Sequence, residues 1–296
     1  MSVKESDLTS SNQYDLAIIS GYGSLPIEIA KVAIGNGRSP YMIGIEGEAE
    51  PGIEAFPHQT LPWGQIGRLF RLLKQFGITE AIFAGGVRRR PEFLKLKLDW
   101  GAVRSLPRVL VFMMGGDNTV LSGTIKIFEG HGVRIAGVHE IAPQLLAASG
   151  TIAGKKPAKQ DLVSMRLAFQ ACKTLGQFDI GQACVAEAAR VVAVEGVEGT
   201  DGMLERIVEL RRVGRMPDEG KNGVLVKTAK PGQDLRADLP AIGPQTVAGV
   251  VKAGLKGIAV EAGHAIVLER EQTLAAAREA GIYIYGISER DGFTDG

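Results

Sequence analysis

The chain has little cysteine, almost no net charge and no long hydrophobic run. Cys172 and Cys184 are its two cysteines, too few for a disulfide framework or a cysteine-only zinc site, so we interpret them as small core residues in a reducing compartment. Lys and Arg number 34 against 33 Asp and Glu. This balance argues against a nucleic-acid partner, which requires a basic field to neutralise phosphates. No run approaches the ~18 apolar residues of a membrane span.

Targeting and catalytic signatures are scarce as well. Residues 1–13 are polar and lack an apolar h-region, so we expect no signal peptide and a cytoplasmic protein. The sequence contains no Gly-x-Ser-x-Gly elbow and no P-loop lysine, which leaves a serine hydrolase or a kinase without support. The histidines show no metal-ligand spacing, and His264 is a weak candidate only because it follows a predicted strand.

Short apolar runs alternate with helical periods along the chain. In the first half, we predict strands at 15–20, 41–45, 80–86 and 132–138, a loop at 46–62, and helices at 27–36, 65–76, 105–113 and 117–130. In the second half, we predict strands at 182–187, 190–194, 223–227, 257–260 and 282–287, and helices at 160–175, 203–212, 243–253 and 271–280. This succession predicts an α/β fold in both halves, with a mostly parallel sheet covered on both faces in the first.

The length of 296 residues exceeds that of a typical domain, so two domains are expected. Residues 149–157 contain Gly150, Gly154 and Pro157 and are the best linker candidate. We therefore predict a disordered extension at 1–14, an N-terminal Rossmann-like domain at 15–150 and a C-terminal α/β domain at 158–296.

Residues that could bind a ligand or take part in catalysis concentrate between positions 195 and 240. A strand at 190–194 leads into a glycine-rich turn with Thr200, Asp201 and Gly202, and a helix follows from position 203. Strand, glycine-rich turn and helix is the arrangement that directs backbone N–H groups at an anion. We interpret the turn as a phosphate-binding element.

An acid cluster follows the strand at 223–227. Pro231 and Pro240 frame it and disfavour a long helix. If the segment is extended, Asp234, Arg236 and Asp238 share one face, because the strand period is two. Mg²⁺ prefers one or two carboxylates with phosphate oxygens and waters, and arginine binds phosphate in a bidentate manner, so this face suits a magnesium–phosphate site. A surface salt-bridge cluster is the alternative.

Glycine turns also follow the strands of the first half. The turn from Gly21 through Gly23 to Pro26, with Glu46 after the next strand, has the outline of a dinucleotide site. Pro26, however, stands where a third glycine should allow the helix to approach the strand closely. A tight turn before a helix is the alternative interpretation.

The two later glycine turns carry charged or polar side chains. Gly85 and Gly86 precede three arginines at 88–90, which could hold a diphosphate or form a solvated face. A second glycine pair precedes Asp117 and Asn118. Asp117 is a natural N-cap, and either side chain could hydrogen-bond a substrate.

Seven short stretches of the sequence, taken in their order along the chain, resemble those of a known protein family. They are Gly-Tyr-Gly-Ser-Leu-Pro (21–26), Ala-Gly-Gly-Val (84–87), Gly-Asp-Asn-Thr-Val-Leu (116–121), Val-Glu-Gly-Thr-Asp-Gly-Met (197–203), Lys-Pro-Gly-Gln-Asp-Leu-Arg-Ala-Asp-Leu-Pro (230–240), Pro-Gln-Thr-Val (244–247) and Ala-Val-Glu-Ala-Gly (259–263). Together they resemble the LpxI-type UDP-2,3-diacylglucosamine pyrophosphatases of lipid A biosynthesis. The resemblance covers about residues 15–288.

The resemblance implies two α/β domains with the active site in the cleft between them. It implies Mg²⁺-dependent hydrolysis, with Mn²⁺ as a substitute metal, of the sugar-nucleotide diphosphate to UMP and 2,3-diacylglucosamine 1-phosphate. The metal-linked aspartate would be Asp234 or Asp238, and this choice stays open. The candidate catalytic residues are Asp234, Asp238, Lys227 and Arg236, and the candidate substrate contacts are Gly21, Gly23, Gly85, Gly86, Asp117, Asn118, Thr200, Asp201 and Gly202.

The expected partner is therefore an acylated UDP-sugar, bound with its acyl chains in an apolar crevice between the domains. Transient contact with the inner-membrane surface is a further expectation, and a homodimer is left open. Two other functions remain as alternatives: a nicotinamide-dependent oxidoreductase that uses residues 21–26 with Glu46, and a non-catalytic nucleotide-sugar-binding protein.

Overall fold

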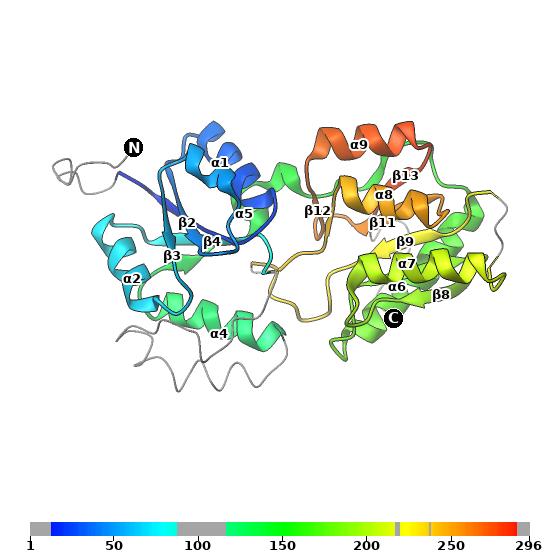
Figure 1. Cartoon of the computed structure of the whole chain (residues 1–296), viewed down its shortest axis with the longest axis horizontal. Coiled ribbons are helices and arrows are strands. Elements are labelled where there is room, and N and C mark those ends of the chain that lie inside the picture. The colour runs from blue at the N-terminus through cyan, green and yellow to red at the C-terminus, as the bar shows by residue number, and fades with distance from the viewer. Residues whose placement is uncertain (1–12, 88–116, 217–219, 237, 289–296) are drawn as a thin grey trace. The chain divides into compact units, whose positions relative to one another are not determined.

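The computed structural model describes residues 13–87, 117–216, 220–236 and 238–288. The chain divides into two compact units, residues 1–142 (unit 1) and residues 143–296 (unit 2). Both are α/β (Figure 1), as the sequence predicts. Within the described residues, no helix is both long and apolar enough to cross a membrane.

Unit 1 is built on a five-stranded sheet in the order β3-β2-β1-β4-β5, and all of its strand pairs are parallel. Its elements are β1 (Leu16–Ser20), α1 (Leu25–Gly35), β2 (Pro40–Ile45), the 3-10 helix η2 (Pro51–Ala55), β3 (His58–Leu61), α2 (Ile66–Gln75), β4 (Glu80–Ala84), α4 (Asp117–Glu129), β5 (Arg134–Ile135) and α5 (Val138–Ile141). The central strands are almost fully buried, as expected of a parallel sheet with helices on its faces.

Helices cover both faces of this sheet, which confirms the predicted architecture. Helices α1 and α5 contact each other, and α1 packs on β1, β2 and β4. On the other face (Figure 1), Phe70 of α2 and Phe83 of β4 both pack edge-on against Phe128 of α4, with ring centroids 5.1 and 5.2 Å apart.

Two predictions for unit 1 are wrong in part. The loop predicted at 46–62 contains η2 and β3. Strand β3 was missed because it is a short edge strand with the polar sequence His-Gln-Thr-Leu, and only its last residue is buried. The strand predicted at 132–138 is limited to Arg134–Ile135, and helix α5 follows. The helix predicted at 105–113 lies outside the described residues.

Unit 2 contains a six-stranded mixed sheet in the order β6-β13-β11-β9-β7-β8 and a two-stranded pair, β10-β12. Its elements are the 3-10 helix η4 (Pro143–Leu145), β6 (Gly150–Ala153), α6 (Lys159–Gly176), β7 (Ala183–Glu187), β8 (Arg190–Val194), α7 (Gly199–Arg212), β9 (Val224–Lys227), β10 (Ala241–Ile242), α8 (Pro244–Lys252), β11 (Gly257–Glu261), β12 (Ile266–Val267), α9 (Arg270–Glu279) and β13 (Tyr283–Ile287). Strands β9, β11 and β13 are parallel to one another, whereas β6 and β7 are antiparallel to their neighbours.

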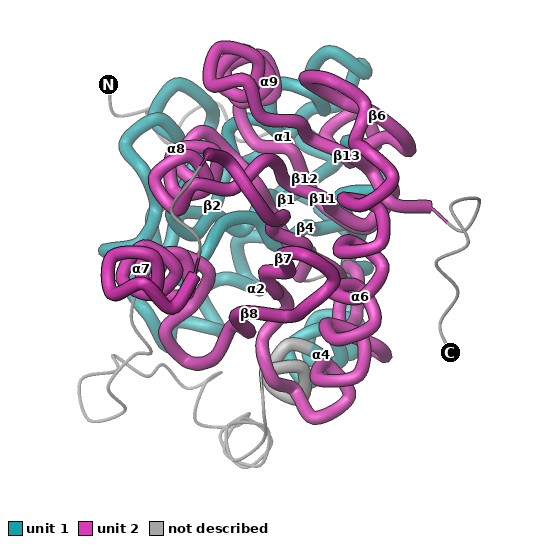
Figure 2. Tube along the Cα trace, turned by 90° about the vertical axis from the view of Figure 1, so that its right-hand side faces the viewer, with its two compact units in different colours: residues 1–142 teal, residues 143–296 magenta. Residues whose placement is uncertain are grey.

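The two faces of this sheet carry separate hydrophobic clusters. Helices α7, α8 and α9 cover one face, where Met203, Ile207 and Val250 meet Leu225 of β9. Helix α6 covers the other face (Figure 2), where Phe169 belongs to a second cluster. Alternate residues of each strand therefore supply two cores.

Residues 149–157 do not form the predicted linker. Strand β6 pairs antiparallel with β13, and Ala153 lies opposite Ile284. Gly150 and Gly154 have φ angles of 83° and 72°, so these glycines serve the turns at the two ends of an edge strand. The boundary between the units lies at Ala142 and Pro143.

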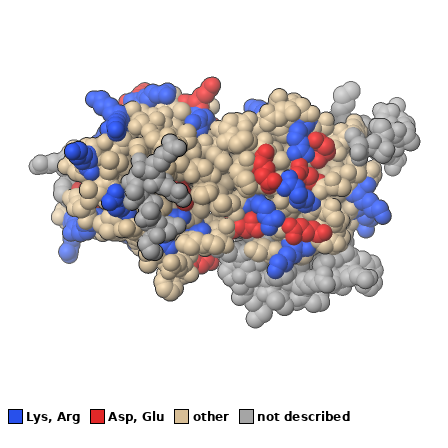
Figure 3. Space-filling view, turned by 180° about the vertical axis from the view of Figure 1, so that it is seen from behind, with Lys and Arg blue, Asp and Glu red and all other residues tan. Residues whose placement is uncertain are grey.

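The carboxyl edge of the parallel strands gathers the chemical groups of unit 2. Strands β9 and β11 end there with Lys227 and Glu261. The antiparallel registers of β7 with β9 and of β8 with β7 bring the segment after Val194 to the same edge. On the face of the whole chain drawn in Figure 3, lysine and arginine side chains lie beside aspartate and glutamate side chains.

Candidate functional site

Lys227, the last residue of β9, is a buried cation at this edge. It is 7% exposed, and its Nζ donates to the carbonyl oxygen of Ala241 at 3.0 Å. Burial lowers the pKa of Lys227, and the carboxylates of Glu195, Asp201 and Asp238 oppose that shift. An ammonium group in such surroundings can stabilise a bound anion or release its proton at a lower pH than an exposed lysine.

An anion-sized pocket of about 250 Å³ opens beside Lys227. The other lining residues come from the first turns of two helices: Glu198, Gly199, Thr200 and Asp201 at the start of α7, and Gln245 and Thr246 at the start of α8. The first N–H groups of a helix have no partner within the helix, and the helix dipole favours negative charge at this end. Two helix starts and a buried ammonium favour a bound anion, whereas the Glu198 and Asp201 carboxylates in the same lining favour a cation.

The predicted phosphate turn belongs to a helix. Helix α7 begins at Gly199, so Thr200, Asp201 and Gly202 lie in its first turn and not before it. The first apolar residue, Met203, is a misleading marker for the helix start, because polar residues are favoured in a first turn. Thr200 Oγ1 donates to Glu195 Oε1 at 2.8 Å, and Glu195 Oε2 accepts the Gln182 N–H at 2.8 Å. Glu195 thus braces the start of α7.

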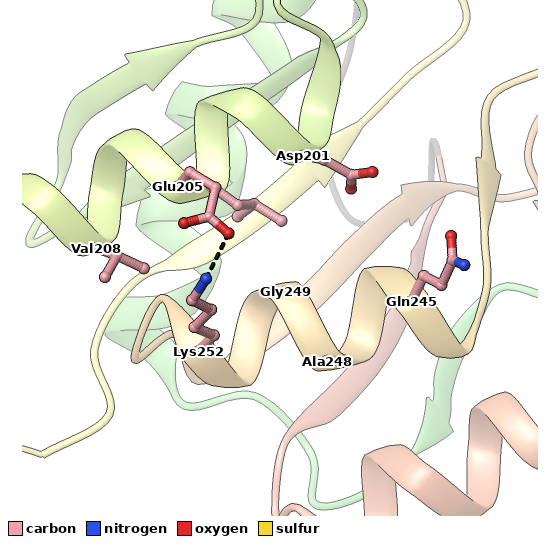
Figure 4. A pocket seen from close by; sticks show the side chains of 8 residues that line it. Asp201, Glu205, Val208, Gln245, Ala248, Gly249 and Lys252 are labelled. Carbon is pink, nitrogen blue, oxygen red and sulfur yellow. Dashed lines mark hydrogen bonds and ion pairs between the residues drawn. The ribbon is translucent and has the colours of Figure 1, made fainter. Parts of the chain in front are cut away.

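A groove of about 320 Å³ between α7 and α8 adjoins this pocket and shares Asp201 and Gln245 with it (Figure 4). The rest of its lining is Leu204, Glu205, Val208, Ala248, Gly249 and Lys252. The helices approach closely, because a Cβ at Gly249 would lie 2.9 Å from Leu204 Cδ1. The Glu205–Lys252 ion pair, at 2.5 Å, crosses the groove.

The acid cluster is a turn and not the extended segment on which the shared Asp-Arg-Asp face depended. The Asp238 N–H donates to the Asp234 carbonyl at 3.4 Å, which folds the segment back on itself. Asp234 Oδ1 accepts the Arg236 N–H at 3.1 Å and its Nε at 2.9 Å, and Oδ2 accepts Nη2 at 2.7 Å. Arg236 therefore neutralises Asp234.

Asp238 has different surroundings. Its Oδ2 accepts a hydrogen bond of 2.5 Å from the neutral amide of Gln233, and its charge acts on Lys227 together with those of Glu195 and Asp201. The structure thus brings the predicted residues Lys227, Thr200, Asp201 and Asp238 to one edge of unit 2.

Several residues of this edge were missed as site candidates. Gln245 and Thr246 line the pocket at the start of α8, and the helix-start rule applied at position 200 would have found them after Pro244. Glu261 ends β11 next to Lys227 on β9. Its carboxylate binds Lys173 Nζ at 2.9 Å, and His264 Nδ1 lies 3.2 Å from the same oxygen.

In unit 1, the structure brings two of the predicted glycine turns together. Strands β1 and β4 are neighbours, and Tyr22 and Gly86 exchange backbone hydrogen bonds of 2.9 Å just beyond them. A Cβ at Gly21 would lie 2.2 Å from the Gly86 carbonyl oxygen, so only glycine fits. Gly23 and Gly85 have φ angles of 97° and 85°. In the order β3-β2-β1-β4-β5 this is the switch point, where such sheets bind ligands.

The side chain of Glu50 contacts this turn. Glu50 Oε1 accepts the Gly23 N–H at 3.4 Å, whereas Glu46, the predicted ribose contact, is exposed. A carboxylate on an N–H group of the turn opposes a phosphate there, because like charges repel. The turn therefore departs from a dinucleotide site, and Pro26 lies in α1 as the sequence indicated.

Some predictions remain untested. The glycine pair at 115–116 and the arginines at 88–90 lie outside the described residues, and Asp117 and Asn118 begin α4 with side chains that also lie outside them. Across the part of the chain that the structure describes, no three His, Cys, Asp or Glu side chains form a group able to hold a metal ion. The metal site and the cleft between the domains stay predictions.

Comparisons with known proteins match both units. The family model of the LpxI N-terminal domain matches residues 15–145, and that of the LpxI C-terminal domain matches residues 148–285. The UDP-2,3-diacylglucosamine pyrophosphatase LpxI of Caulobacter vibrioides (strain ATCC 19089 / CIP 103742 / CB 15) is 34% identical over 276 residues, which cover 93% of this chain and 98% of that protein. The resemblance found in the sequence is thereby confirmed, and this chain belongs to the LpxI family.

Proposed function

We propose that this chain hydrolyses the diphosphate of UDP-2,3-diacylglucosamine, with Mg²⁺, to UMP and 2,3-diacylglucosamine 1-phosphate in lipid A biosynthesis. The relative from Caulobacter vibrioides carries the name of this activity and matches nearly the full length of both chains. The observation that carries the proposal is the pocket formed by buried Lys227 and the starts of α7 and α8, with the Asp238 carboxylate close enough to act on Lys227.

The pocket supplies what a phosphate group needs. The N–H groups of two first turns and the Lys227 ammonium all favour negative charge. We assign one phosphate of the substrate to this pocket, with the Gln245 and Thr246 side chains as further hydrogen-bond partners. These groups also stabilise the charge that develops when the bridging oxygen leaves.

The donor set fits Mg²⁺. Asp201 lines the pocket, and the charge of Asp238 acts on the Lys227 ammonium that also lines it; Mg²⁺ typically takes one or two such carboxylates together with phosphate oxygens and waters. We propose Asp238 over Asp234, because Asp234 is paired with the Arg236 guanidinium, whereas the charge of Asp238 acts on the Lys227 ammonium at the pocket. When bound, the metal would act as a Lewis acid and lower the pKa of a coordinated water.

The chain's own groups then account for the rest of the reaction. A water oxygen bonds to one phosphorus and gives up a proton to the solvent, the bond from that phosphorus to the bridging oxygen breaks, and the other phosphate leaves with the electron pair. Lys227 holds the phosphate oxygens while charge builds up. Arg236 is assigned to the fold of the turn through Asp234. In-line displacement of this kind requires mainly positioning and charge stabilisation from the protein.

The alternatives gain no support from the described residues. A nicotinamide cofactor would place its diphosphate at the turn after β1, where Glu50 accepts the Gly23 N–H. A non-catalytic binding protein has no need of a carboxylate beside the anion pocket. Action in the cytoplasm, transient contact with the inner-membrane surface and a homodimer remain proposals that follow from the acylated substrate and the resemblance.

The test is hydrolysis of UDP-2,3-diacylglucosamine in ¹⁸O-labelled water, with and without Mg²⁺ and with EDTA. We expect UMP only with the metal, and the product that carries the label identifies the phosphorus attacked. No UMP release at any Mg²⁺ or Mn²⁺ concentration, together with tight binding of the intact substrate, would favour the non-catalytic alternative.

Two substitutions test whether Asp238 or Asp234 holds the metal. We expect Asp238→Asn to lower kcat/KM by about 10²-fold or more, because it removes the charge proposed to hold the metal. Asp234→Asn, the matched control, weakens the contact with Arg236 and should act mainly on the free energy of unfolding. The reverse ranking of the two activities would move the metal assignment to Asp234.

A further inference from the structure

Gln233 lies in the turn that carries both aspartates, and the proposed reaction gives it no role. It is 8% exposed. Its N–H donates to the Lys230 carbonyl at 3.1 Å and closes a β-turn with Pro231 and Gly232 at the central positions. Gly232 has a φ of 72°, and proline followed by glycine with positive φ is the type II pattern. The turn therefore fixes the backbone from which the Gln233 side chain leaves.

The orientation of the Gln233 amide is decided by its neighbours. The Lys230 N–H donates to Gln233 Oε1 at 2.8 Å. A backbone N–H can only donate, so this end of the amide must be the oxygen and the other end the NH₂ group. Nε2 accordingly donates to Asp238 Oδ2 at 2.5 Å. A donor of fixed direction and no charge orients a carboxylate without neutralising it.

A partly buried ion pair, Lys173 with Glu261, contacts the residue that precedes the turn. Ala229, which precedes it, donates its N–H to Glu261 Oε2 at 3.0 Å, and its carbonyl accepts from Lys173 Nζ at 3.2 Å. Lys173 Nζ also binds the two Glu261 oxygens at 2.9 and 3.0 Å. Helix α6 abuts the turn, because a Cβ at Gly176 would lie 2.9 Å from Pro231 Cδ.

We propose that Gln233 is a positioning residue that orients the Asp238 carboxylate for its work in catalysis, and that the Lys173–Glu261 pair fixes the turn that carries it. The inference rests on the proposed function of Asp238. Groups that hydrogen-bond a metal-ligating carboxylate typically account for about 10–100-fold in metal affinity or activity. Loss of the Gln233 amide should have an effect of this order.

The first test is Gln233→Met, which keeps an unbranched side chain and removes the donor. We expect kcat/KM to fall about 10–100-fold, with a similar loss of Mn²⁺ affinity in the presence of UMP, measured by EPR without turnover. Because the substitution also leaves the Lys230 N–H without its acceptor, the midpoint of thermal unfolding should fall by a few degrees, with the chain still folded at the assay temperature. Gln272→Met, on the exposed side of α9, is the matched control and should alter none of these values.

Gln233→Glu adds a second readout, with kcat/KM compared only at pH values where circular dichroism shows the variant to be folded. A protonated Glu can donate to Asp238 as the amide does, whereas an ionised Glu repels it. The ratio of variant to wild-type kcat/KM should therefore fall as pH rises through the titration of the new carboxyl group. A ratio that is independent of pH would overturn the inference. This test does not require Gln233→Met to fold.

The outcomes separate this inference from the proposed function. If the wild-type chain releases no UMP, the proposed function fails, and Mn²⁺ binding by wild type and Gln233→Met still decides whether the amide supports a metal site. If the wild-type chain is active and Gln233→Met keeps both kcat/KM and Mn²⁺ affinity within about threefold, Gln233 does not position Asp238.

Discussion

At the scale of single residues, the surroundings decide what equivalent side chains do. Asp234 and Asp238 are four positions apart, yet one is paired with a guanidinium and the other with an amide. Lys227 is buried beside carboxylates, whereas Lys252 pairs with Glu205 on an exposed side of its helix. The distinction between a site residue and a surface residue thus lies in burial and partners, which residue type alone does not reveal.

The lowered pKa of Lys227 has a consequence for stability. Between that lowered pKa and the ordinary lysine value of about 10.4, the unfolded chain binds more protons at this residue than the folded chain does. The contribution of Lys227 to the free energy of unfolding therefore rises with pH through this window. We expect Lys227→Met to remove this rise, measured as the difference from wild type in urea unfolding across the window.

The control for this experiment is Lys252→Met, whose side chain is 59% exposed. Its urea unfolding profile should run parallel to that of the wild-type chain at every pH. Parallel profiles for Lys227→Met as well would mean that the Lys227 ammonium is not desolvated in the folded protein.

At the scale of elements, the starts of α7 and α8 form the anion pocket, and buried polar contacts hold these helices in place. Arg211, in the last turn of α7, is 6% exposed and binds Glu187 of β7 at 2.6 Å. Its Nε also donates to the Ala253 carbonyl, at the end of α8, at 2.9 Å. One guanidinium thereby links both helices to the sheet.

Removal of this guanidinium should be costly. Arg211→Met leaves the Glu187 charge buried without its partner, so we expect the free energy of unfolding to fall by about 3–5 kcal/mol in urea titrations. Arg212→Met is the neighbouring control, because Arg212 pairs with Glu209 at the surface, and it should leave the free energy of unfolding unchanged. Equal effects of the two substitutions would contradict the structural role of Arg211.

At the scale of the whole molecule, each unit has its own sheet with helices on both faces. Unit 2 holds two hydrophobic clusters formed entirely by residues after position 143. We therefore expect a fragment of residues 143–296 to fold by itself and to unfold in one cooperative transition. Near-UV circular dichroism recorded during heating measures this transition.

A fragment that begins at position 158, the boundary predicted from the sequence, is the informative comparison. It lacks β6 and exposes the edge of β13 that β6 covers, and an uncovered apolar edge promotes aggregation. We expect it to unfold at a lower temperature or to aggregate. If the two fragments are equally stable, β6 is not part of the folding unit.

The fold class, the family and most elements could be predicted from the amino-acid sequence, because apolar periodicity and glycine placement are local properties. The strands at 182–187 and 190–194 and the helix at 160–175 were predicted within a residue or so of their observed bounds. Short or polar elements such as β3 and β6 were missed, since their place in the sheet depends on distant neighbours and not on their own composition.

How the candidate residues combine depends on contacts between distant parts of the chain. The sequence placed Asp234 and Asp238 on one face of an extended segment, but the turn pairs Asp234 with Arg236 and directs Gln233 at Asp238. Lys173 and Glu261, 88 positions apart, meet because α6 packs on β9, the neighbour of β11 in the sheet. Such contacts join residues distant in the chain, and spacing along a sequence carries no information about them.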